Sequence, residues 1–75
     1  MKEKAGRYEI RLKDHVDEHW EVRFEGMKLW ATFDDNGSPV SLLSGLIADQ
    51  SQLHSILTRI RDAGMTIISI IRVDE

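Results

Sequence analysis

The spacing of hydrophobic and polar residues changes several times along the chain, and each spacing predicts a different element. Tyr8, Ile10 and Leu12 alternate with charged residues, which predicts a strand over 8–13 with one buried face. Residues 27–33 and 39–46 read as two further strands. Residues 66–73 are apolar and rich in β-branched side chains, which predicts a fourth strand.

One helix has both of its ends marked between Asp49 and Gly64. Asp49 can accept hydrogen bonds from the first helical amides, and Gln52, three residues later, can complete a capping box. Gly64 can adopt the left-handed conformation that ends a helix, with Met65 folding back in a Schellman motif. Four apolar residues recur at the spacing of a single buried stripe, namely Leu53, Ile56, Leu57 and Ile60.

Residues 14–26 fit two different elements. Trp20 and Phe24 lie four residues apart, as on one face of a short amphipathic helix, and each lies two residues from Val22, as on one face of a strand. The aspartate that opens the segment and the glycine that closes it favour a helix. We therefore expect a short helix here and keep the strand as the alternative.

Asn36 and Gly37 separate the two middle strands and are a strong hairpin signal. A two-residue type I′ turn needs positive φ at both positions, which these residues tolerate. This turn places Trp30 opposite Leu43 on one face of the hairpin. The residues expected on the other face are Met27, Leu29, Ala31, Phe33, Val40, Leu42 and Leu46.

The predicted order is β-α-β-β-α-β, which gives an α+β fold, a two-layer ferredoxin-like split sandwich with both helices on one face of an antiparallel sheet. If 14–26 is not a helix, the alternative is a four- to five-stranded sheet with one helix. The 75 residues are too few for two cores, so we expect a single domain over 8–74. Residues 1–7 are expected to be a flexible lead-in.

A two-layer fold of this kind leaves one face of the sheet without helices. We expect Trp30 and Leu43 on that face as anchors of an interface, with Arg11 and Arg72 at its polar rim. The expected partner is a second copy of the chain, forming a homodimer, or another protein. The alternatives are that a loop, the N-terminal tail or a shifted register covers Trp30, or that the face holds a small-molecule groove.

Composition narrows the possible partners further. The net charge of −3 and the pI near 5.5 argue against nucleic-acid binding. The longest nearly apolar run, residues 65–71, is far shorter than the roughly 20 residues that span a bilayer. There is no cysteine, and no apolar leader follows the charged N-terminus. We therefore expect a cytoplasmic protein.

No motif assembles a catalytic or metal site. His15, Glu18 and His19 match the H-x-x-E-H pattern of inverted zinc peptidases, but a third ligand and a substrate cleft are not evident. Residues 34–37 resemble the start of a calcium loop without its later glutamate, and a hairpin turn explains them better. We expect no catalytic residue, no cofactor and no metal, and hence a non-enzymatic interaction module. The alternative function is small-ligand sensing.

The chain also carries a set of residues that is specific as a whole and weak one by one: the stretch YEIRLK at 8–13, Trp20, Phe24, Gly26, the pairs 44–45, 49–50 and 53–54, the stretch RIRD at 59–62, Gly64 and Ser69. With this set the chain resembles a family of small uncharacterised bacterial proteins, over nearly its whole length. The resemblance implies a bacterial cytosolic origin and a helix over 14–26. It implies no activity, cofactor or catalytic residue.

Overall fold

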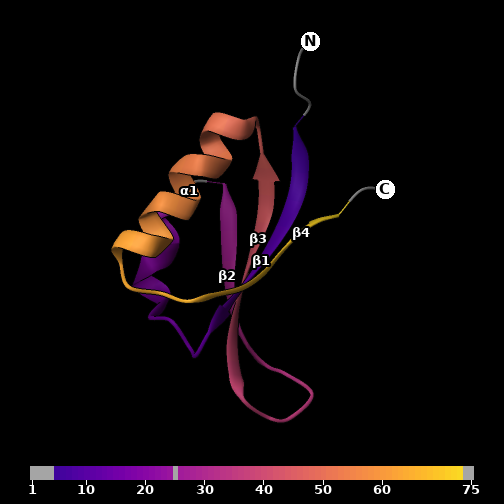
Figure 1. The fold of residues 1–75 in the computed structure, drawn as a ribbon, viewed down its shortest axis with the longest axis vertical. Helices are drawn as coiled ribbons and strands as arrows, with labels where there is room; N and C mark the ends of the chain where they lie inside the picture. The colour runs from indigo at the N-terminus through magenta and orange to yellow at the C-terminus, as the bar shows by residue number, and fades with distance from the viewer. Residues whose placement is uncertain (1–4, 25, 74–75) are drawn as a thin grey trace.

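The computed structural model describes residues 5–24 and 26–73, which form one sheet and the helices on one of its sides (Figure 1). The elements in chain order are β1 (Gly6–Lys13), the 3-10 helix η1 (Glu18–Arg23), β2 (Met27–Phe33), β3 (Pro39–Ile47), α1 (Gln50–Asp62) and β4 (Ile67–Val73). The sheet has the order β2-β3-β1-β4, and each neighbouring pair is antiparallel. The expected α+β class and its alternative form, a sheet of four strands with one α-helix, are confirmed.

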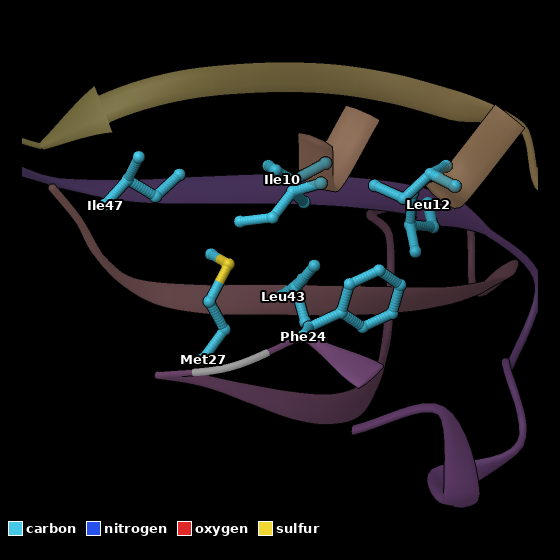
Figure 2. Packing of buried hydrophobic residues seen from close by; sticks show 8 residues of the cluster. Ile10, Leu12, Phe24, Met27, Leu43 and Ile47 are labelled. Carbon is cyan, nitrogen blue, oxygen red and sulfur yellow. The ribbon is translucent and has the colours of Figure 1, made fainter. Parts of the chain in front are cut away.

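The hydrophobic core lies between the sheet and the two helices. Figure 2 shows its side chains reaching from several elements into one space. Removing each large apolar side chain from water contributes about 1.5–3 kcal/mol, so this cluster is the main source of stability in a chain without disulfides. Its buried members are Ile10, Leu12, Phe24, Met27, Leu43, Ile47, Ile56 and Ile60.

Both predicted ends of α1 are confirmed. The Asp49 carboxylate accepts a hydrogen bond from the Gln52 amide at 2.9 Å. The Gln52 side chain accepts from the Ala48 amide at 2.6 Å instead of from the amide of Asp49 itself, so the capping box is shifted by one residue. Gly64 has a φ of 79°, and the Met65 amide donates to the Ile60 carbonyl at 3.1 Å, which is the bond that defines a Schellman motif.

The prediction of an α-helix over 14–26 is wrong. The segment forms the six-residue 3-10 helix η1, whose first turn is capped by Asp17. Asp14, the expected cap, has a φ of 69°, and its amide bonds to the Pro39 carbonyl at the end of the β1–β3 ladder. Phe24 is fully buried just after η1. Trp20 and Phe24 nevertheless lie together, with their ring centroids 6.5 Å apart, because Phe24 follows η1 and turns back toward the core.

The predicted hairpin register is wrong by one residue. Phe33 pairs with Pro39 and Trp30 pairs with Leu42, whereas Leu43 pairs with Leu29. Only Gly37 has positive φ in the turn, as in the longer hairpin loops that end on a left-handed residue. Because successive side chains of a strand point to opposite faces, the shift moves Leu43 into the core.

The first and last strands begin at positions other than the predicted ones. β1 begins at Gly6, inside the expected flexible lead-in of residues 1–7. Residues 1–4 of that lead-in, and residue 74 of the expected domain 8–74, lie outside the described residues. The last strand begins at Ile67, one residue later than predicted.

Candidate interaction surface

The sheet face opposite α1, called the open face below, exposes apolar side chains to solvent. Trp30 on β2 is 57% exposed, Leu46 on β3 is 58% exposed and Ile71 on β4 is 49% exposed. Side chains alternate between the two faces of a strand, and each of these residues is next in sequence to a residue whose side chain faces α1. They therefore point away from α1. Exposed apolar area gathered on one face is typical of an interaction site.

Trp30 and Arg11, two of the four predicted interface residues, lie in one row across the open face. Trp30 pairs with Leu42, Leu42 pairs with Arg11, and Arg11 pairs with Ser69. Leu42, which the sequence assigned to the opposite face, therefore lies between the two predicted residues. The Ser69 hydroxyl is buried and has no hydrogen-bond partner within the described residues.

The other two predicted interface residues lie on the side of α1. Leu43 is fully buried in the core. Arg72 pairs with Tyr8, and its guanidinium lies 5.8 Å from the centroid of the Tyr8 ring. A Cβ atom on Gly6 would lie 2.9 Å from the same guanidinium, so Arg72 packs closely over the backbone there. Leu43 and Arg72 are thus not part of the open face.

The open face is positively charged although the whole chain carries a net charge of −3. Its cations are Arg7, Arg11, Lys13 and Lys28, and its one described anion is Glu9. None of these cations makes an ion pair within the described part of the chain. The face is therefore complementary to an acidic surface and repels a second copy of itself.

The outer edge of β2 is partly covered by the preceding segment. The Leu29 amide donates to the Glu21 carboxylate at 2.8 Å. The Nε2 atom of His15 lies 2.8 Å from the Thr32 carbonyl oxygen and donates to it in the tautomer with a proton on Nε2. The Met27 amide donates to the Phe24 carbonyl at 3.0 Å. The Met27 and Leu29 amides are therefore occupied and are not presented to another chain, whereas the Thr32 carbonyl lies on the β3 side of the strand.

The outer edge of β4 has no such cover among the described residues. In the sheet, β4 pairs with β1 and stands at the end of the strand order. Ile68 and Ile71 are each about half exposed. The β1–β4 register shifts between Arg11 and Leu12, which leaves Ile68 as a bulge. An apolar edge strand of this kind can pair with another strand.

A shallow hollow of about 470 Å³ lies between η1 and the C-terminal half of α1. The Arg23 guanidinium lies 5.4 Å from the centroid of the Trp20 ring. Arg59 donates a hydrogen bond to the Arg23 carbonyl. Asp62 and Ala63 complete the lining. Two guanidinium groups beside an indole suit a ligand that combines a flat ring with an anionic group.

The histidine motif does not converge in space. His15 lies before η1, where its ring packs edge-on against Phe33 with the centroids 5.0 Å apart. His19 is exposed and pairs with Asp17 at 2.9 Å. Over residues 5–24 and 26–73 there is no group of three or more His, Cys, Asp or Glu side chains placed to hold a metal ion. The Asp34 carboxylate, proposed above as part of a turn, accepts hydrogen bonds from two amides of its own hairpin loop.

The comparisons with known proteins give one match. The family model of DUF8691, a domain of unknown function, matches residues 7–71. No curated protein and no solved structure matches the chain. Among the described residues, the helices are too short or too polar to cross a membrane.

Proposed function

We propose that the chain, which belongs to the DUF8691 family of domains of unknown function, is a non-enzymatic interaction module that works through self-association or through a protein partner bound to its sheet. One observation carries the proposal. The exposed large apolar side chains of the described residues gather on the strands, with the exception of Val22 on η1. Such side chains contribute to stability only when a partner removes them from water.

We also propose that the fold is a reduced ferredoxin-like sandwich. The strand order β2-β3-β1-β4 supports this, because two interleaved β-α-β crossovers give such an order. In this interpretation η1 and the loop before it replace the first helix, and Phe24 supplies the core contact that the helix would make.

The molecular mass in solution tests self-association. We expect sedimentation equilibrium to give a dimer at micromolar concentrations. Ile71→Lys, which places a charge on the open edge, should give a monomer. Val22→Lys is the matched control, because Val22 is 83% exposed and lies on η1 instead of on β4, and it should remain a dimer. A wild type that is a monomer at every concentration would contradict self-association.

A second candidate function is small-ligand sensing in the hollow between η1 and α1. The stacked Arg23 and Trp20 side chains favour it. An aromatic carboxylate that binds there should raise the melting temperature, because a ligand that binds the folded state stabilises it. Arg23→Ala should remove the increase, whereas Arg61→Ala, outside the hollow lining, should keep it. If no aromatic carboxylate raises the melting temperature of the wild type, this second function is rejected.

A further inference from the structure

We infer that a second copy of the chain pairs with β4 in antiparallel orientation, about a two-fold axis that passes through Ile71. The inference rests on the proposed self-association and specifies the surface, the register and the partner. It predicts one eight-stranded sheet in which the two β4 strands lie side by side. Both copies of α1 then lie on the same side, and the two open faces form one continuous surface.

Charge and edge protection together select β4. Stacking two open faces would bring Arg7, Arg11 and Lys13 of one copy against the same cations of the other, which is unfavourable. Pairing through β2 would displace the hydrogen bond from the Leu29 amide to Glu21. Pairing through β4 has neither cost, because Arg72 is the one charged residue among 69–73 and it packs over Tyr8 on the side of α1.

The bulge at Ile68 determines the register. Between Ser69 and Val73 the β1–β4 ladder is regular, with partners from Arg11 back to Arg7. A bulge distorts the strand and interrupts further pairing. The two-fold axis that pairs all five regular residues of β4 with a second copy passes through the middle one, Ile71. Ser69 then lies opposite the partner's Val73, and Ile70 lies opposite the partner's Arg72.

This arrangement covers the exposed apolar area of the edge. Ile71, 49% exposed, meets the partner's Ile71 on the open face, and Ile70, 42% exposed, lies beside the long side chain of the partner's Arg72. Directly opposed apolar pairs of this kind contribute to sheet stability. The amide and carbonyl of Ile70, which face the outer edge of β4, gain hydrogen-bond partners at the same time.

Single cysteines test the register, because the natural chain contains none. Directly opposed residues of antiparallel strands have Cα atoms about 4.5–5.5 Å apart, within the range of about 4.4–6.8 Å that a disulfide requires. Ile71→Cys should therefore form a covalent dimer under mild oxidation. Ile70→Cys should not, because its copies would be diagonal neighbours about 7–8 Å apart. Ser69→Cys and, on the β2 edge, Thr32→Cys should also remain monomeric on a non-reducing gel.

The outcomes separate the inference from the proposed function. If Ile70→Cys or Ser69→Cys cross-links faster than Ile71→Cys, the Ile71 register is wrong. If the wild type is a dimer and none of the three cysteine variants on β4 cross-links, self-association stands and pairing through β4 is rejected. A wild-type monomer rejects both. Hydrogen exchange of the wild type needs no substitution. The Ile70 amide, which faces the outer edge, should become at least tenfold better protected as concentration rises, and unchanged protection would overturn the inference.

Discussion

The Glu21 carboxylate accepts a hydrogen bond from the Leu29 amide across 2.8 Å, so a side chain of η1 occupies a main-chain donor at the outer edge of β2. Both groups are partly buried. The short helix thus does more than connect β1 to β2, because it covers part of one edge of the sheet. The difference between a partly covered β2 edge and the β4 edge follows in part from this contact.

Removing the Glu21 carboxylate should destabilise the domain. Glu21→Ala leaves the Leu29 amide without its partner, and a buried donor that loses a charged acceptor costs about 1–3 kcal/mol. Urea denaturation followed by tryptophan fluorescence measures the loss. Glu21→Gln keeps an acceptor oxygen and should therefore lose less stability than Glu21→Ala. Glu18→Ala, an exposed substitution in the same helix, is the control, and an equal loss in both alanine variants would count against the edge role.

The register of the hairpin can be tested with two neighbouring leucines. Leu43 is fully buried and Leu42 is partly exposed. Leu43→Ala should cost about 2–5 kcal/mol of unfolding free energy, the range for a cavity in a packed core. Leu42→Ala should cost clearly less, because water already reaches that side chain. The reverse order, measured by urea denaturation, would instead support the register with Trp30 opposite Leu43.

The features that the sequence predicted correctly depend on neighbours in the chain. The bounds of β2 and the ends of α1 follow from local spacing and from caps within four residues. Which side chains of β3 face the core does not follow from local spacing, because it depends on the backbone conformation of the loop before β3. Asp34 accepts hydrogen bonds from the Asn36 and Ser38 amides and holds a loop that is longer than the predicted two-residue turn.

The candidate surface was predictable only in part for the same reason. Trp30 and Arg11 follow from strand alternation, which their own strands determine. Leu43 was assigned to the open face from the predicted hairpin register, and the error of one residue in that register placed it on the wrong face. Arg72 depends on the bulge at Ile68, where β4 gains a residue relative to β1, and no residue type near the bulge marks it in the sequence. The contact of Glu21 with Leu29 joins two elements and has no sequence signal either.

Substitution in the hairpin loop should lower the unfolding free energy at Gly37 and not at the neighbouring Asn36. Gly37 has a φ of 81° and open space around its α-carbon, so Gly37→Ala should cost about 1–2 kcal/mol through backbone strain alone. Asn36 does not have positive φ, so Asn36→Ala should be nearly neutral. In a type I′ turn both residues would need positive φ and both alanines would destabilise. Comparing the two variants by thermal or urea unfolding distinguishes the loops.

Reversing a charge on the open face should leave self-association through β4 unchanged. In the proposed pairing Arg11 and the partner's Arg7 lie three strands apart, about 14 Å, which exceeds the screening length of about 8 Å at physiological ionic strength. The dissociation constant from sedimentation should therefore change less than about threefold in Arg11→Glu, or between low and high salt. Two stacked open faces would behave differently, since their cations would lie close together across the interface. Tighter association in Arg11→Glu and in high salt would indicate stacked faces and contradict pairing at the edge.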